Sequence, residues 1–145
     1  MEGRDGPGVG RGLGRAVTAT YLDTNVAVWL AQNSLDRLSM GAIEHLKGPG
    51  TERLLSPAVL LELQFLYELK RILLPPADIQ RKLEHEFGVR VCILDFSSIV
   101  MTALDEMWTR DPFDRLITAQ ARANGLAWLV TADRRIREHY LRAIW

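Results

Sequence analysis

The side chains of this sequence that could carry out chemistry are carboxylates placed just after short apolar runs. Asp23 follows VTATYL directly, and Asp133 follows LAWLV with two residues between. In an open α/β sheet, ligands bind outside the carboxyl ends of the strands, so both acids stand where a site is expected. An aspartate between a strand and a helix is also a favoured N-cap, because its side chain accepts a backbone N–H of the first turn. Capping stays open as the alternative for both residues.

A third acid, Glu62, lies within the helix predicted over residues 57–71. At about 100° per residue, Gln64, Glu68 and Arg71 form its solvated stripe, and Glu62 lies roughly 150° from that stripe. A carboxylate on a core-facing side must be paired, protonated or bound to a cation, since an isolated buried charge is too costly. A salt bridge to a buried arginine and a bound cation both stay open for Glu62.

The segment RDPFDR at 110–115 adds two acids that are three residues apart. Asp111 as N-cap, Pro112 at the first helical position and Asp114 two residues later predict a helix start similar to a capping box. Capping is therefore the simpler interpretation of Asp111. Asp114 shares its helix face with small side chains such as Thr118, which leave room for a hydrated ion.

Other catalytic arrangements find no support in the sequence. The three histidines lie on amphipathic stretches with polar neighbours, and no H-E-x-x-H or C-x-x-C occurs, so we expect His45, His85 and His139 at the surface. The single cysteine, Cys92, lies in the apolar run VRVCIL. It is expected to be a small buried hydrophobe in a reducing compartment, which predicts a cytoplasmic protein.

Length and composition predict one folded domain. The chain has 145 residues, 48% of them hydrophobic and 25% charged, which is average for globular proteins. Eighteen basic and eighteen acidic residues cancel, so binding to nucleic acid must be local. No apolar run reaches the roughly 20 residues that span a bilayer, so no membrane partner is expected. The Gly/Arg-rich residues 1–16 are predicted to be a disordered tail, and residues 17–145 the domain.

Short apolar strands alternate with helices along the domain, which predicts an α/β fold with a parallel sheet of about four to five strands between helix layers. The predicted strands are 17–22, 53–56, 89–96, 126–131 and 143–145, of which 89–96 has the strongest pattern. The predicted helices are 25–33, 39–47, 57–71, 77–87, 97–108, 111–124 and 134–141. The helix over 57–71 is apolar around much of its circumference, which suggests a subunit interface and hence a homodimer.

Four segments in this order resemble the PIN-domain nucleases: YLDTN, SPAVLLELQ, DPFDRLITAQA and LVTAD. The chain is most similar to VapC-type toxin ribonucleases with a D-P-F-D-R signature, and the resemblance covers residues 17–145. It implies a three-layer α/β/α sandwich. It also implies that the family's catalytic and metal-binding acids correspond to four residues here, with Asp111 as an occasional fifth and Thr131 as a neighbouring hydroxyl: Asp23, Glu62, Asp114 and Asp133.

Electrostatics and the resemblance agree on a metal ion. Several carboxylates in one pocket cannot all stay ionised without a cation, and all-oxygen ligands select Mg²⁺ or Mn²⁺. The resemblance implies an endoribonuclease that hydrolyses RNA phosphodiesters with metal-activated water, as the toxin of a VapBC-type pair with a cognate antitoxin. Arg115, Arg134 and Arg135 are candidates for contacts to the RNA backbone, with ordinary solvated helix faces as the alternative.

Three other functions are alternatives to a toxin ribonuclease: a protein-binding module, a solitary nuclease and a protein that forms an aspartyl phosphate. A PIN fold with structural acids could be a protein-binding module, but it would be expected to have lost at least one acid. A solitary RNA-processing nuclease would act without an antitoxin. Enzymes and receivers that form an aspartyl phosphate need a D-x-D pair or a late lysine. Here Thr24 and Asn25 follow Asp23, and no lysine lies beyond Lys82.

Overall fold

The computed structural model describes residues 17–145, and the tail predicted for residues 1–16 lies outside them. A five-stranded sheet in the order β3-β2-β1-β4-β5 forms the centre, and every neighbouring pair of strands is parallel. Its strands are β1 Thr18–Leu22, β2 Thr51–Leu55, β3 Arg90–Val91, β4 Trp128–Val130 and β5 Ala143–Ile144. The predicted parallel sheet and its number of strands are confirmed.

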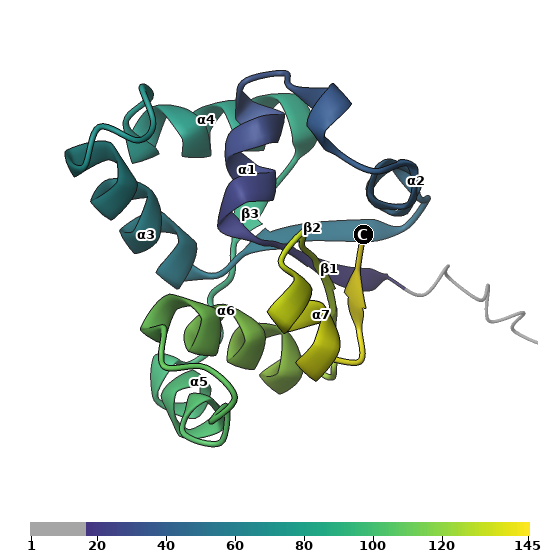
Figure 1. The fold of residues 1–145 in the computed structure, drawn as a ribbon. Helices are drawn as coiled ribbons and strands as arrows, with labels where there is room; N and C mark the ends of the chain where they lie inside the picture. Colours follow the sequence, from purple (N-terminus) through teal and green to yellow (C-terminus); the bar gives the residue numbers. More distant parts are fainter. Residues whose placement is uncertain (1–16) are drawn as a thin grey trace, which may run out of the picture.

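Helices cover both faces of this sheet, as expected for a three-layer α/β/α sandwich (Figure 1). One layer contains α1 Thr24–Ala31, α2 Met40–Lys47, α3 Pro57–Glu68 and α4 Pro76–Phe87, with a short 3₁₀ turn at Leu35–Arg37. The other contains α5 Phe96–Ala103, α6 Pro112–Ala123 and α7 Arg134–His139. Across the described residues, every helix is too short or too polar to span a lipid bilayer.

The central strands β1 and β4 set the position of two candidate acids. Leu22, Leu129 and Val130 have no exposed surface, as expected of strands covered on both faces. The backbone N–H of Asp23 donates to the carbonyl of Val130 at 3.0 Å, so the carboxyl ends of the two strands lie side by side. This pairing brings the loops that follow both strands to one edge of the sheet.

Three helix ends follow the expected capping chemistry. Ser56 caps α3, with its Oγ accepting from the N–H of Ala58 at 3.2 Å, and Asp111 caps α6. Gly88 ends α4 with φ +64°, a left-handed conformation that glycine adopts without strain. The start of α5 differs from the predicted helix 97–108: the helix begins at Phe96, and Asp95 caps it by accepting from the N–H of Ser98 at 3.1 Å.

The strand predicted over 89–96 is mostly wrong. Only Arg90–Val91 pair as a strand, and the N–H of Cys92 then donates to Leu55 at 2.8 Å. The neighbouring β2 ends at Leu55, so no strand remains to pair with residues 93–95. The side chain of Ile93 is consequently 97% exposed. The helices predicted to reach residues 71 and 108 also end earlier, at Glu68 and Ala103.

His45 is a second correction, because it is half-buried instead of lying at the surface. Its Nε2 lies 2.9 Å from Oγ1 of Thr20, and its ring packs against Trp128 with centroids 5.2 Å apart. Burial lowers its pKa. His85 and His139 are exposed, as expected.

Candidate active site

Asp23 lies at the end of β1 and is only 8% exposed. Its Oδ1 accepts from the N–H of Thr24 at 2.8 Å, and its Oδ2 accepts from the hydroxyl of Thr131 at 2.6 Å. Burial raises the pKa of Asp23, although both hydrogen bonds favour the charged carboxylate. Asp23 therefore caps α1, as the alternative interpretation expected. Its burial also disfavours the charged form of the carboxylate.

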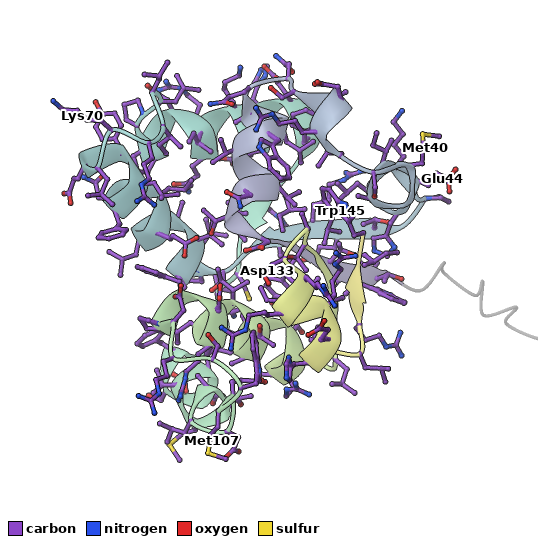
Figure 2. All side chains as sticks on the ribbon, viewed as in Figure 1. Met40, Glu44, Lys70, Met107, Asp133 and Trp145 are labelled. Carbon is purple, nitrogen blue, oxygen red and sulfur yellow. The ribbon has the colours of Figure 1, made fainter. Side chains whose placement is uncertain are left out.

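Thr131 connects Asp23 to the loop after β4. It has no exposed surface, and its Oγ1 also accepts from the backbone N–H of Asp133 at 3.0 Å. Asp133 is exposed at the start of α7, where Oδ1 accepts from the N–H groups of Arg135 and Ile136 at 2.8 and 3.1 Å. Figure 2 shows Asp133 between the two helix layers, close to the carboxyl end of the sheet.

Glu62 lies on α3, whose N-terminus follows β2 directly, and its side chain is half-buried. Burial, followed by the charges of Asp23 and Asp111, raises the pKa of Glu62 to about 7. The hydroxyl of Thr24 acts in the opposite direction. Glu62 consequently faces the carboxylate at the end of β1 and not the solvated side of its own helix, as its helical position predicts.

Asp114 lies in the first turn of α6 and is half-buried. Burial and four neighbouring carboxylates, Asp111 foremost and then Asp23, Asp133 and Glu62, raise its pKa to about 7. Asp111 itself is exposed and caps α6, with Oδ1 accepting from the N–H groups of Phe113 and Asp114. The charges of Asp111, Asp23, Asp133 and Glu62 all act on Asp114, so the five candidate acids lie in one region of the molecule.

Arginine does not neutralise this pocket. The ion pairs among residues 17–145 join Arg81 to Asp78, Arg90 to Glu52, Arg122 to Glu106 and Arg134 to Glu138, and none involves a candidate acid. The salt bridge left open for Glu62 is thus not present among these residues. The remaining states for a half-buried carboxylate are a proton or a cation.

The donor set fits a hard divalent ion. All five acids and the two nearby threonines offer oxygen, the ligand that Mg²⁺ and Mn²⁺ prefer. The hydroxyl of Thr24, a residue that is 1% exposed, makes no full hydrogen bond within the described residues, which indicates a missing polar partner at the pocket. As the side chains stand in residues 17–145, no three histidine, cysteine or acidic groups already form a metal-binding cluster.

The three candidate arginines differ in their exposure and in their hydrogen-bond partners. Arg115 is half-buried, and its Nε donates to the carbonyl of Thr109 at 2.7 Å. Arg135 is exposed and donates to the carbonyl of Trp108 at 2.6 Å. Arg134 is exposed and pairs with Glu138 one turn along α7. All three keep donor groups for a phosphate, because a guanidinium carries five N–H donors.

Two supporting residues have no recognisable signal in the sequence. Gln120 is 2% exposed on α6, and its Oε1 accepts from Ser56 Oγ at 3.1 Å, which joins the helix of Asp114 to the cap of the helix of Glu62. Glu106 is 3% exposed and accepts from Arg122 and from Trp108 Nε1 at 2.5 and 2.6 Å. It thereby anchors the loop that leads to Asp111.

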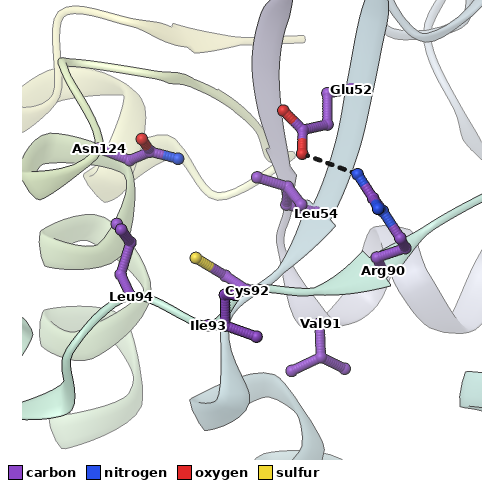
Figure 3. Close-up of a pocket in the computed structure, with 8 residues that line it drawn as sticks. All are labelled: Glu52, Leu54, Arg90, Val91, Cys92, Ile93, Leu94 and Asn124. Atoms are coloured by element: carbon purple, nitrogen blue, oxygen red, sulfur yellow. Dashed lines mark hydrogen bonds and ion pairs between the residues drawn. The ribbon is translucent and has the colours of Figure 1, made fainter.

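Two cavities within residues 17–145 lie apart from the candidate acids. One of about 380 Å³ is lined by Cys92, Leu94, Asn124 and the ion pair of Glu52 with Arg90 at the edge of β2 and β3 (Figure 3). Cys92 is buried as predicted, and its Sγ additionally accepts from Tyr21 at 3.0 Å and Gln120 at 3.3 Å. Neither this cavity nor one of about 420 Å³ near Trp128 and Arg142 is lined by a candidate acid.

Comparisons with known proteins agree with this architecture. Among solved structures, the chain is similar to the crystal structure of VapBC2 from Rickettsia felis bound to a DNA fragment from their promoter, with a TM-score of 0.52. The two chains are 21% identical, and the match covers 83% of this chain and 92% of that one, which supports a shared fold. No curated protein matches the chain. The model of the PIN domain matches residues 20–140, and the chain therefore belongs to the PIN-domain family of nucleases.

Proposed function

We propose that this protein is an endoribonuclease that depends on Mg²⁺ or Mn²⁺ and acts as the toxin of a VapBC-type pair. The observation that supports the proposal is the electrostatic coupling of Asp23, Glu62 and Asp114. Each of these carboxyl groups has a pKa raised first by burial and then by its acidic neighbours. No arginine or lysine of residues 17–145 forms an ion pair with any of them. Such a pocket attracts a divalent cation.

The four acids hold the ion in two ways. Asp23 and Asp114 would contact it most directly, while Glu62 and Asp133 would complete its shell partly through water. Oδ1 of Asp133 is occupied by two backbone N–H groups, which leaves Oδ2 for the ligand. The bound ion would supply activation of the attacking water and neutralisation of the phosphodiester charge.

The remaining residues orient the acids and the substrate. Thr131 holds Asp23 and the backbone of Asp133 together through one hydroxyl. Asp111 stabilises the first turn of α6 and thereby the position of Asp114. Arg115, Arg134 and Arg135 contact the RNA backbone, which the acidic pocket would otherwise repel. The choice of RNA over DNA rests on the resemblance to VapC-type ribonucleases.

The partner is proposed from the structural neighbour and from exposed apolar side chains. The neighbour is a VapBC2 complex bound to promoter DNA, which supports an antitoxin here. On α3, Leu61 is 61% exposed and Phe65, one turn later, is 49% exposed, so the two side chains together offer a partner helix an apolar contact. A reading frame for a small DNA-binding protein beside this gene would support the antitoxin, and its absence would favour a solitary nuclease.

A cleavage assay tests the activity and the site together. Single-stranded and structured RNA, and DNA of the same sequences, are incubated with the protein in Mg²⁺, Mn²⁺ or excess chelator. We expect RNA to be cut only with a divalent ion. Asp23→Asn and Asp114→Asn should each lower the rate by more than the roughly 10- to 100-fold loss typical of residues that only support a metal ligand.

Asp78→Asn is the matched control, because Asp78 is an acid in the first turn of α4 that pairs with Arg81 in solvent. It should cut RNA at the wild-type rate. Undiminished cleavage in chelator, or by both site variants, would contradict the metal-dependent mechanism. Cleavage of DNA alone would contradict the proposed substrate.

A further inference from the structure

Two buried threonine hydroxyls of residues 17–145 have no hydrogen-bond partner, those of Thr24 and Thr118. A buried polar group without a partner destabilises the fold, so each such group requires an explanation. Thr118 lies within α6, one turn after Asp114, and its hydroxyl is not among the groups that shift the pKa of that acid. Thr24 differs, because its surroundings are the candidate active site itself.

Thr24 lies between two acids that come from different elements. It is the first residue of α1, and its backbone N–H donates to Oδ1 of Asp23 at 2.8 Å. Its side-chain hydroxyl lies close enough to Glu62 to favour the charged carboxylate, yet it forms no full hydrogen bond there. The hydroxyl thus has its one proton and two lone pairs at the inner edge of the pocket between Asp23 and Glu62.

The chemistry of a bound ion supplies the missing partner. Mg²⁺ gives up its hydration shell reluctantly and keeps several waters in protein sites. A water on the ion donates hydrogen bonds strongly, and a neutral hydroxyl with free lone pairs can accept one. The proton of the same hydroxyl then remains available for the carboxylate of Glu62.

We infer that Thr24 is a positioning residue of the metal site, whose hydroxyl accepts from an ion-bound water and donates to Glu62. This inference rests on the proposed metal-dependent function. It goes beyond the acid set because it assigns a role to a neutral side chain that contacts no ion. It also explains why a threonine is buried here without a partner of its own.

The test compares two substitutions at this position in the full chain. Thr24→Val keeps the shape of the side chain and removes the hydroxyl, whereas Thr24→Ser keeps the hydroxyl. Mn²⁺ binding is measured by calorimetry, and the melting temperature is measured in chelator. We expect Thr24→Val to weaken Mn²⁺ binding by about 10-fold or more, as losses around metal ligands do, and Thr24→Ser to bind nearly as well as wild type.

The melting temperature in chelator separates this role from a structural one. Without an ion, Thr24→Val should melt no lower than wild type, because the lost hydroxyl had no full hydrogen bond to contribute. Thr20→Val is the matched control: Thr20 is fully buried on β1, but its hydroxyl is bonded to His45. That variant should melt lower and bind Mn²⁺ as wild type does.

Two results would overturn the assignment of Thr24. One is unchanged Mn²⁺ affinity in Thr24→Val, and the other is an equal loss of affinity in Thr24→Ser, which would assign the effect to packing. Failure of the wild-type protein to bind Mn²⁺ would overturn the metal site itself, and the inference with it. The affinity of the wild type therefore distinguishes failure of the proposed function from failure of this inference.

Discussion

The candidate acids with a raised pKa, Asp23, Glu62 and Asp114, are buried or half-buried, and burial is the first cause of each shift. Asp23 is almost fully buried, whereas Asp111 and Asp133 are exposed and use Oδ1 to cap α6 and α7. Glu62 and Asp114 lie between these extremes, and the pKa of each is raised to about 7. Capping and ligand binding are compatible in one aspartate, since a carboxylate has two oxygens and about four acceptor sites.

These shifts predict how the stability of the metal-free protein depends on pH. Unfolded carboxyl groups titrate near about 4, so between about pH 4 and pH 7 the folded chain binds more protons than the unfolded chain at Glu62 and Asp114. The free energy of unfolding contributed by these groups therefore falls as pH rises through that window. The prediction concerns the difference in free energy of unfolding between Asp114→Asn and wild type, measured in chelator. This difference should favour the variant more at pH 8 than at pH 5.

Urea unfolding at both pH values gives this difference. His45 acts in the opposite direction, because its pKa is lowered on folding, so the measured quantity is the change between variant and wild type and not the profile of either. Asp78→Asn serves again as the exposed control and should show a parallel profile. If the free energies of unfolding of wild type and Asp114→Asn changed equally with pH, the raised pKa of the Asp114 carboxyl would be contradicted.

The helices that carry the acids are held together by side chains that touch no acid. Ser56 caps α3 and also donates to Gln120 of α6, so the helix of Glu62 and the helix of Asp114 share one buried hydrogen bond. Gln120 additionally donates to Cys92 after β3. The spacing of two acids from distant parts of the chain therefore depends on one amide.

Replacing that amide should loosen the site. Gln120→Met removes both hydrogen bonds at similar volume and leaves Ser56 and Cys92 without them, which should lower the free energy of unfolding by about 1–3 kcal/mol. Gln64→Met is the matched control on α3, where the amide bonds Glu68 in solvent, and it should change stability by less than about 0.5 kcal/mol. Urea denaturation measures both. Equal stabilities of the two variants would show that the buried bond contributes nothing.

At the scale of the whole molecule, α3 leaves an apolar surface uncovered. This α3 surface consists of Leu61 and Phe65 on the helix and Leu69 directly after its end, which are 61%, 49% and 48% exposed. At about 100° per residue, Glu62 lies only about 60° from the centre of this surface, so a partner bound there would contact the element that bears a candidate ligand. The sequence predicted a homodimer from the same helix.

The prediction can be tested by mass in solution. The wild-type protein should sediment as a dimer at micromolar concentration, and Leu61→Glu should shift it toward the monomer, because an unpaired charge opposes burial of the surface. Met40→Glu changes a 72% exposed side chain on α2 and should leave the dimer intact. A wild-type monomer, or a Leu61→Glu dimer as stable as the wild type, would exclude this surface as the dimer contact.

The sequence by itself determined features that depend on neighbouring residues. The parallel sheet followed from apolar strands alternating with helices, and the cap Asp111 followed from the spacing of Asp111, Pro112 and Asp114. The predictions from the sequence were wrong where the structure of a segment depends on contacts with distant parts of the chain. The strand pattern of residues 89–96 is strong, but β2 ends at Leu55 and leaves most of that segment unpaired. His45 was predicted at the surface from its polar neighbours in the sequence, but Thr20 and Trp128, which are distant in the chain, pack against it.

The proposed convergence of the acids depends on the tertiary structure. Nothing within residues 57–68 indicates that Glu62 faces Asp23, because that neighbour arrives only when α3 packs beside the end of β1. The unpartnered hydroxyl of Thr24 and the buried amide of Gln120 likewise depend on contacts between elements far apart in the chain. Local patterns are set by neighbours a few residues away, whereas a shared pocket depends on how separate elements pack, and only the folded chain decides that.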